Sequence, residues 1–176
     1  KYNKMPIGVI SDIKKHVPAY SEKKYDAFYS GQVNHPRREE LVKVLERFPN
    51  ALSNPTKGFT QGYNLFEYYE KMHQSRICPS PAGALTIDSF RFYEAIEMLS
   101  LPIADAKNSV NQVNNFWEIL FGKDTPFEQV TDWNQLDALM PKLLSDYPNN
   151  LHRVVSWWIM YKRNFRNKIM EQVNAY

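Results

Sequence analysis

The chain has 176 residues, of which 43% are hydrophobic and 14% aromatic, a composition that excludes disorder as the main state and indicates one domain. Its net charge of +3 is too mild to indicate a nucleic-acid or membrane surface by itself. The single cysteine, Cys78, excludes an internal disulfide and a Cys-x-x-Cys metal site. The apolar stretches are too short to span a bilayer and no signal-peptide pattern opens the chain, so we expect no transmembrane segment and a cytoplasmic location.

The first 24 residues are basic and irregular. Residues 7–10 could form a short strand, but Pro6, Pro18 and the neighbouring lysines favour a linker or N-terminal arm over 1–24. From Tyr25 onward, short β-rich runs alternate with segments of helical periodicity.

This alternation continues through residues 25–146. We expect strands at 25–31, 51–53, 76–79, 101–104 and 129–131, and helices at 36–48, 65–72, 90–99, 110–120 and 134–144. The pattern predicts an α/β fold, a Rossmann-like parallel sheet with helices on both faces. Apolar residues at helical spacing from Leu151 to about Gln172 predict a long amphipathic helix within 147–176 that packs on this domain.

In parallel sheets of this kind, ligands bind outside the carboxyl ends of the strands. The loops of interest are therefore 31–38, 54–62, 79–89 and 104–109. The chain has no Gly-x-Gly-x-x-Gly or Walker A motif, which disfavours a nicotinamide or P-loop site. The four histidines show no ligand spacing and no paired-acid motif is present, so we expect no metal site.

The segment 75–103 reads as strand, turn, helix and strand, and carries the most informative chemistry. Its turn contains Ser80 and Gly83 together with two prolines, and proline and glycine can bring the backbone close to a ligand. Ser89 begins a helix, where free amide groups attract phosphate. Arg91 lies within one turn of that end and could clamp an anion, and Glu94 follows at a spacing that shares its face and could accept hydrogen bonds from ribose hydroxyls.

The same segment resembles the C-terminal, donor-binding half of an exostosin-type glycosyltransferase of the GT-B fold. The resemblance is carried by Ile-Cys-Pro at 77–79, Gly83, Asp-Ser-x-Arg-x-x-Glu-Ala at 88–95 and Leu-Pro-Ile at 101–103. Upstream, Phe-Tyr-Ser-Gly at 28–31, ending in Gly31, is similar to the first strand of that half, and Arg37 to the start of its first helix. The resemblance covers roughly 25–120 and implies a nucleotide-sugar donor, with Glu94 on the ribose and Ser89 and Arg91 near the diphosphate.

Plainer interpretations remain open for several of these residues. Glu94 and Arg91 could form an ordinary surface ion pair, and the arginines at 37–38 could be a solvated first turn. The tyrosines at 63, 68 and 69 could stack a base, although core packing is the more frequent role. Cys78 has the character of a small buried hydrophobe. The basic terminal helix could meet an anionic surface, but a helix packed through Trp158 explains it equally simply.

The sequence therefore predicts a glycosyltransferase donor-binding domain that transfers a sugar from a nucleoside-diphosphate sugar to a hydroxyl of a glycan or other acceptor. The site residues of this prediction are Ser80, Gly83, Ser89, Arg91 and Glu94, with Gly31 and Arg37 from the first strand and helix. No further cofactor is needed and no catalytic base is assigned. The family's other half implies an N-terminal domain or partner chain that completes the cleft. The alternative is a non-catalytic module of the same fold in a larger assembly, and a nucleic-acid-binding domain is a third reading that the mild charge disfavours.

Overall fold

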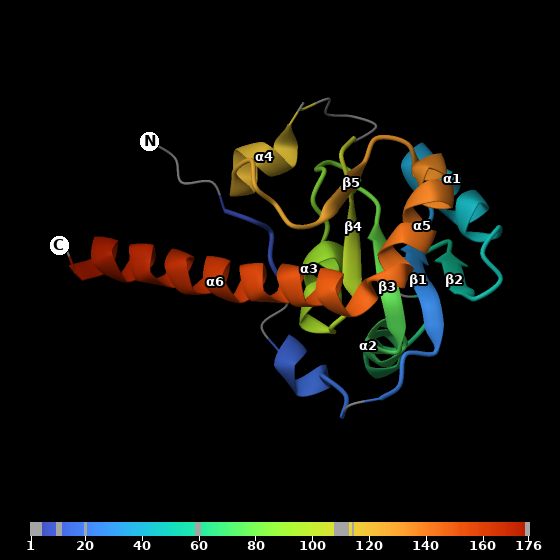
Figure 1. Ribbon diagram of the computed structural model, residues 1–176, viewed down its shortest axis with the longest axis horizontal. Coiled ribbons are helices and arrows are strands. Elements are labelled where there is room, and N and C mark those ends of the chain that lie inside the picture. The colour runs from blue at the N-terminus through green and yellow to red at the C-terminus, as the bar shows by residue number, and fades with distance from the viewer. Residues whose placement is uncertain are drawn as a thin grey trace.

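The computed structural model describes residues 5–9, 12–19, 21–58, 61–107, 113 and 115–174. Its centre is a sheet of five parallel strands in the order β2-β1-β3-β4-β5 (Figure 1). Parallel neighbours need crossover connections, which helices usually supply, and this arrangement confirms the predicted α/β, Rossmann-like fold. The strands are β1 (Tyr25–Gln32), β2 (Ala51–Thr56), β3 (Ser75–Ser80), β4 (Leu101–Asp105) and β5 (Glu128–Val130).

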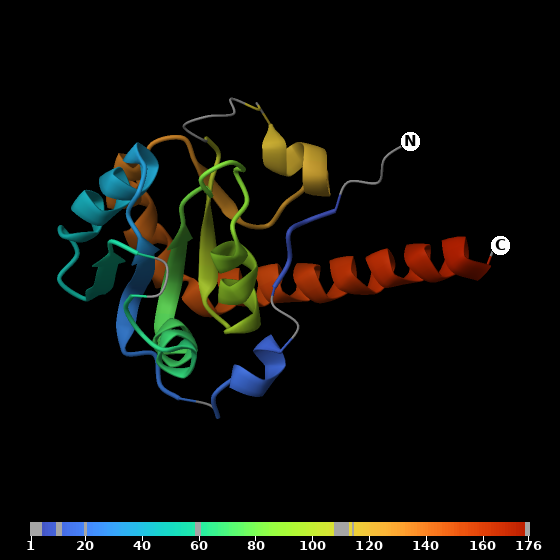
Figure 2. The same ribbon diagram turned by 180° about the vertical axis from the view of Figure 1, so that it is seen from behind.

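Helices cover both faces of this sheet. Figure 2 shows α2 and α3 in front of the strands, with α5 and the start of α6 behind them. The α-helices are α1 (Pro36–Leu45), α2 (Leu65–His73), α3 (Phe90–Glu97), α4 (Phe116–Phe121), α5 (Leu136–Ser145) and α6 (Tyr147–Asn174), and two short 3-10 helices are η1 (Ile13–His16) and η2 (Trp133–Gln135).

Strand β1, which lies between β2 and β3, is apolar at successive positions because it is covered on both sides. Ala27 belongs to the core cluster that contains Leu41 of α1, whereas the next residue, Phe28, packs with Tyr69 and Met72 of α2. Successive side chains of a strand point to opposite faces. In a strand that is buried on both faces, apolar and polar residues therefore do not alternate along the sequence.

In the sheet, β2 lies on one side of β1, whereas β3, β4 and β5 follow on the other side. The order in which the chain adds strands therefore reverses between β1 and β3. Their pairing extends from Tyr25 opposite Ser75 to Ala27 opposite Ile77, and Pro79, two residues further along β3, has no N–H to donate. Beyond this point the end of β1 pairs with β2, up to Gln32 opposite Thr56. A reversal of strand order is where open α/β sheets form a ligand crevice at the carboxyl edge.

The terminal helix α6 begins at Tyr147, one turn before Leu151, the first residue of its apolar periodicity. Its buried residues are Tyr147, Asn150, Val154 and Trp158, which confirms packing through the Trp158 face. Beyond Trp158 the helix runs out from the body of the domain (Figure 1). No helix in the described part of the chain is long and apolar enough to cross a membrane.

The segment before β1 lies against the helices rather than in the sheet. Residues 5–9 form no strand, and position 10 of the suggested strand lies outside the described residues. The Lys23 ammonium donates hydrogen bonds to the carbonyls of His73, Ser75 (3.1 Å) and Leu99 (2.6 Å). This single side chain therefore ties the segment to the ends of α2 and α3.

The helix expected over 110–120 is shorter in the structure. It begins only at Phe116, because Asn115 has a left-handed backbone with φ of 59°, which interrupts an α-helix. Val113 is not helical, and positions 110–112 and 114 lie outside the described residues. Trp117 anchors this short helix, since its indole N–H donates to the Asp105 carbonyl at 2.7 Å.

Candidate functional site

A pocket of about 340 Å³ lies at the carboxyl end of β1, beside the reversal of strand order. Its wall is formed by the last residues of β1, Arg38 of α1, the end of β2, the start of α2 with the loop before it, and the first two turns of α3. Ser89, Arg91, Glu94 and Gly31 all line it. The structure therefore brings together four of the seven residues that the sequence singled out.

Glu94 is held in place by two tyrosines of α2. Its carboxylate accepts hydrogen bonds from the Tyr68 hydroxyl at 3.1 Å and the Tyr69 hydroxyl at 3.0 Å, one on each oxygen. Burial raises the pKa of Glu94 above its ordinary value, although the two hydroxyl donors and Arg91 act in the opposite direction. Each oxygen of a carboxylate can accept more than one hydrogen bond, so this oriented group retains capacity for a ligand.

Arg91 is also buried, and it points across the end of β1. Its Nη2 donates to the Ser30 carbonyl at 2.6 Å, and the guanidinium lies 4.7 Å from the centre of the Tyr29 ring. The Arg91 Nε is buried without a hydrogen-bond partner among the described residues. Arg91 and Glu94 do not form the exposed surface pair considered above, because both side chains are buried at the pocket.

Gly31 is the residue over which Arg91 crosses. A Cβ built at Gly31 collides with the Arg91 Nη2, so a side chain at this position would displace the guanidinium. The glycine at the end of the first strand therefore permits the contact between α3 and β1.

We expect Gly31→Ala to lower the free energy of unfolding by about 1–3 kcal/mol, because the Arg91–Ser30 hydrogen bond is lost and buried groups are left unpaired. Chemical denaturation measures the change. Gly58→Ala is the matched control, since a Cβ there makes only ordinary contact with the flexible end of Gln61. Equal stabilities of the two variants would contradict the assigned role of Gly31.

The start of α3 presents a second polar group to the pocket. Ser89 is the residue before the helix, with an extended backbone, but its side chain does not cap the helix. The Ser89 hydroxyl is instead buried with no partner among the described residues. Free amide groups and an unpaired hydroxyl at this position suit an anionic ligand.

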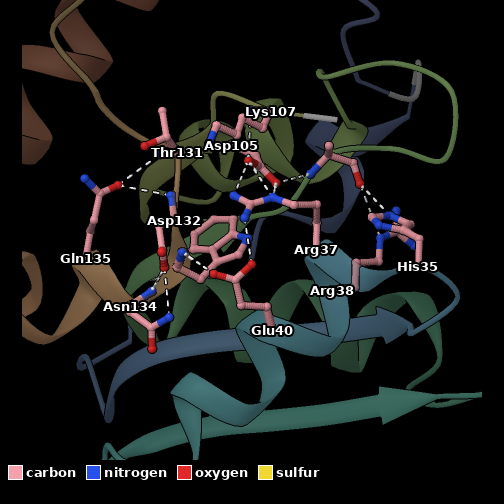
Figure 3. Close-up of polar contacts among 12 residues, drawn as sticks. His35, Arg37, Arg38, Glu40, Asp105, Lys107, Thr131, Asp132, Asn134 and Gln135 are labelled. Carbon is pink, nitrogen blue, oxygen red and sulfur yellow. Dashed lines mark hydrogen bonds and ion pairs between the residues drawn. The ribbon is translucent and has the colours of Figure 1, made fainter. Parts of the chain in front are cut away.

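Arg37 lies outside the pocket, in a separate cluster at the end of β4. Figure 3 shows its guanidinium between the carboxylates of Asp105 and Glu40. The Arg37 Nη2 lies 2.6 Å from Asp105 Oδ1, and the Arg37 Nη1 lies 2.7 Å from Glu40 Oε2. Asp105 is fully buried and also accepts a hydrogen bond from the Ala82 amide at 3.2 Å. Within the described contacts Arg37 therefore neutralises a buried acid and joins α1 to β4.

Ser80 and Gly83 are not among the residues that line the pocket. The Ser80 hydroxyl is buried and donates to the Cys78 carbonyl at 3.1 Å. Gly83 lies close to the Asp88 carbonyl, and a Cβ there would approach that oxygen to 3.2 Å. Both residues shape the loop between β3 and α3, and their role toward a ligand stays a prediction.

The sequence motif predicts Arg37 as a site residue, whereas the pocket is lined by its neighbour Arg38. The signal that separates them was present in the helix periodicity. Arg37 lies four residues before Leu41 and seven before Val44, in the middle of the buried stripe of α1. A charged residue at such a position needs a buried partner, whereas Arg38 lies toward the edge of the stripe.

The tyrosines at 63, 68 and 69 were expected either to stack a base or to pack in the core, and the structure divides them between a pocket wall and the core. Tyr63 and Tyr68 line the pocket, together with the half-exposed ring of Phe90, whereas Tyr69 is fully buried beneath them. The pocket therefore presents aromatic surface next to its charged groups. Periodicity could not reveal that the Tyr68 and Tyr69 hydroxyls converge on Glu94, because this contact joins two separate helices.

Two other residues near the site that could take part in chemistry, Asp88 and Cys78, have structural roles in the fold. Asp88 is buried and accepts hydrogen bonds from the Ile7 amide and the Tyr93 hydroxyl. Cys78 is buried, and burial raises the pKa of its thiol to about 12, as expected for a packing residue. Among the described residues no three His, Cys, Asp or Glu side chains gather as a metal site.

Two comparisons place this chain among known proteins. A family model described as the RXYLT1 C-terminal domain matches residues 7–176. Exostosin-1c of Danio rerio is 33% identical over 75 residues, which are 43% of this chain and 8% of that protein. The chain thus spans a small part of the length of this relative. Together these matches confirm the exostosin-type C-terminal domain that the motif in 77–103 indicated.

Proposed function

Because the chain belongs to the RXYLT1 C-terminal domain family, we propose that its pocket binds the nucleoside-diphosphate sugar of a glycosyl transfer reaction. One observation carries this proposal: Glu94, Arg91 and Ser89 converge from α3 on a single cavity at the reversal of strand order. Such a reversal is the usual ligand crevice of open α/β sheets.

The chemistry of the wall suits each part of a nucleotide sugar. The Glu94 carboxylate, oriented by the tyrosine hydroxyls, can accept hydrogen bonds from the two hydroxyls of a ribose. Arg91 and the amino end of α3 favour the diphosphate. The rings of Tyr63, Tyr68 and Phe90 offer apolar surface to a base or sugar.

In this proposal the protein promotes transfer by stabilising the departing diphosphate. Charge develops on the leaving group as the bond to the sugar breaks, and preorganised cations and amide groups bind that charge best in the transition state. The acceptor hydroxyl must reach the sugar from the open side of the pocket. A further part of a longer protein or a partner chain would supply the acceptor surface and the base.

A second candidate is a domain of the same fold that binds the nucleotide sugar without catalysing transfer. The observation that favours it is that Glu94 is the one carboxylate among the residues lining the pocket, and both its oxygens already accept hydrogen bonds. Turnover of a nucleotide sugar by the intact protein, in the presence of its acceptor, separates the two candidates.

Thermal unfolding in the presence of nucleotides tests donor binding. We expect one nucleoside diphosphate or its sugar conjugate, from a panel of uridine and guanosine compounds, to stabilise the protein by about 1.4 kcal/mol at ten times its dissociation constant. Glu94→Gln preserves the shape of the side chain and should abolish or strongly reduce this stabilisation.

Glu118→Gln serves as the control, because Glu118 is a half-exposed carboxylate of α4 that does not line the pocket. It should respond to the panel as the wild type does. A folded wild-type protein that no nucleotide stabilises would refute the proposed function. Equal stabilisation of the wild type and Glu94→Gln would remove Glu94 from the site.

A further inference from the structure

The buried face of α6 continues along the helix after it has left the body of the domain. Val154 and Trp158 pack into the core, and Phe165 and Ile169 follow seven and eleven positions after Trp158. Residues at these spacings lie on nearly the same face of an α-helix. Phe165 is partly exposed and Ile169 is 43% exposed. One apolar stripe is therefore buried in the inner half of α6 and accessible in the outer half.

The outer part of this stripe forms one wall of a groove of about 320 Å³. The other wall is the segment before β1, through Met5, Pro6 and Gly8. Figure 2 shows this segment descending toward α6 where the helix leaves the domain. The α6 side chains that line this groove, called the α6 groove below, are Trp158, Tyr161, Lys162, Phe165, Arg166, Ile169 and Met170.

The cations of the outer helix exceed its acids. From position 159 to 174 the charged residues are Lys162, Arg163, Arg166, Lys168 and Glu171. Lys162 forms an ion pair with Glu97 of α3, whereas Arg166 forms none with a described residue. The α6 groove therefore places an unpaired guanidinium beside apolar surface. An occupant with carboxylates beside apolar side chains is complementary to this arrangement.

The shape of the α6 groove favours a helix as its occupant. Apolar residues at intervals of three and four form ridges that pack against the side chains of a second helix. A flat lipid surface cannot reach the stripe without displacing Met5 and Pro6, which form the opposite wall. The α6 helix of a second copy would bring the same excess of cations, and like charges in one interface repel each other.

We infer that the α6 groove is a docking site for an acidic amphipathic helix of a partner protein. The apolar residues of that helix lie along the stripe of α6, and its carboxylates pair with Arg166. The stripe from Trp158 to Ile169 is about 17 Å long, so about three turns of the partner helix cover it. This inference does not depend on nucleotide binding, because the α6 groove shares no lining residue with the pocket at β1.

Fluorescence anisotropy of the full chain with two labelled synthetic peptides tests the inference. One peptide has leucines at intervals of three and four along a helix, with glutamates beside them, and the other has lysines in place of the glutamates. We expect the acidic peptide to bind at least about 10-fold more tightly, because attraction to Arg166 replaces repulsion. Equal affinities, or no binding of the acidic peptide to the folded protein, would overturn the inference.

A matched pair of isoleucines tests whether the apolar stripe carries the binding. Ile169 and Ile159 are both exposed on α6, but only Ile169 lines the α6 groove. We expect Ile169→Ser to weaken binding of the acidic peptide about 10-fold, whereas Ile159→Ser should leave it unchanged. Thermal unfolding checks that both variants are folded. Equal effects of the two substitutions would place the binding elsewhere and overturn the inference.

A matched pair of arginines tests the contribution of charge. Arg166 and Arg163 are both exposed, and only Arg166 lines the α6 groove. Arg166→Glu should weaken the acidic peptide about 5- to 10-fold and strengthen the basic one, and Arg163→Glu should change both much less. Unchanged peptide preference in Arg166→Glu would contradict the assigned chemistry of the partner.

Two further measurements separate the other occupants. Flotation with vesicles of phosphatidylcholine and phosphatidylserine in equal parts reports binding to an anionic lipid surface. Analytical ultracentrifugation reports self-association. Vesicle binding or dimerisation that is lost in Ile169→Ser, in a protein that does not distinguish the two peptides, would assign the α6 groove to lipid or to a second copy and overturn the inference.

Discussion

Replacing Arg37 by alanine is expected to lower the free energy of unfolding by about 3–5 kcal/mol, because it leaves the fully buried Asp105 carboxylate without its cation. The Arg37 guanidinium contacts Asp105 through Nε and Nη2 and Glu40 through Nη1, and also lies over the Trp133 ring at 5.7 Å. One substitution therefore uncouples α1, β4 and η2 at once. Equilibrium denaturation in urea measures the loss.

Arg47→Ala provides the matched comparison on the same side of the domain. Its ion pair with Asp137 is about half exposed at both ends, and exposed pairs contribute about 0–1 kcal/mol. The double variant Arg37→Ala with Asp105→Asn should recover part of the lost stability, since the uncompensated charge is removed. A loss of less than 1 kcal/mol in Arg37→Ala would show that Arg37 is free for a ligand, as the sequence interpretation proposed.

Replacing Trp158 by alanine is expected to cost about 3–5 kcal/mol and to loosen α6 from the domain. The Trp158 ring is 5% exposed, contacts Tyr93 at 5.5 Å between ring centres, and donates from Nε1 to Glu97 at 2.7 Å. Alanine removes this packing and, among the described residues, leaves Glu97 with the Lys162 ammonium as its remaining side-chain partner. Thermal unfolding and amide hydrogen exchange along α6 report the two effects.

The neighbouring residue on the same helix is a stringent control. Ile159 is 55% exposed, so Ile159→Ala should change stability by no more than about 0.5 kcal/mol. Similar losses in Trp158→Ala and Ile159→Ala would mean that α6 does not pack through the face described above. Slow hydrogen exchange along α6 in Trp158→Ala would contradict the anchoring role of the indole.

Local sequence patterns were sufficient for the sheet and for α3. β1 is indicated by three consecutive apolar residues, 27–29, within a β-rich run. Ser89 immediately precedes the short helix α3, and Arg91 and Glu94 lie on it, so their spacing alone places them together. Arg37 and Arg38 show that the motif alone does not suffice, because adjacent helical residues point in directions about 100° apart and the periodicity of α1 has to be used to see that Arg37 faces the core. The orientation of Glu94 by α2 was likewise beyond local reasoning, since no sequence spacing links Tyr68 to Glu94.

The left-handed backbone of Asn115 explains why the helix predicted over 110–120 begins only at Phe116. The periodicity over 110–120 is helical, yet the backbone at Asn115 ends any helix approaching from the amino side. Asparagine adopts this conformation more readily than most residues, so the sequence permitted the interruption without requiring it.

The parallel pairing of the whole sheet also has a kinetic consequence. No strand can find its neighbour through a short hairpin, because Ala27 must meet both Ala51 and Ile77 across intervening helices. Contacts between residues so distant in sequence form slowly, since the chain loses much entropy before they stabilise it. The pocket draws Ser30, Arg38, Tyr68 and Glu94 from four separate elements, so it closes only after the crossovers are in place. Recovery of ligand binding during refolding is therefore expected to lag behind the recovery of helix content, and to mark the moment at which the central strands have paired.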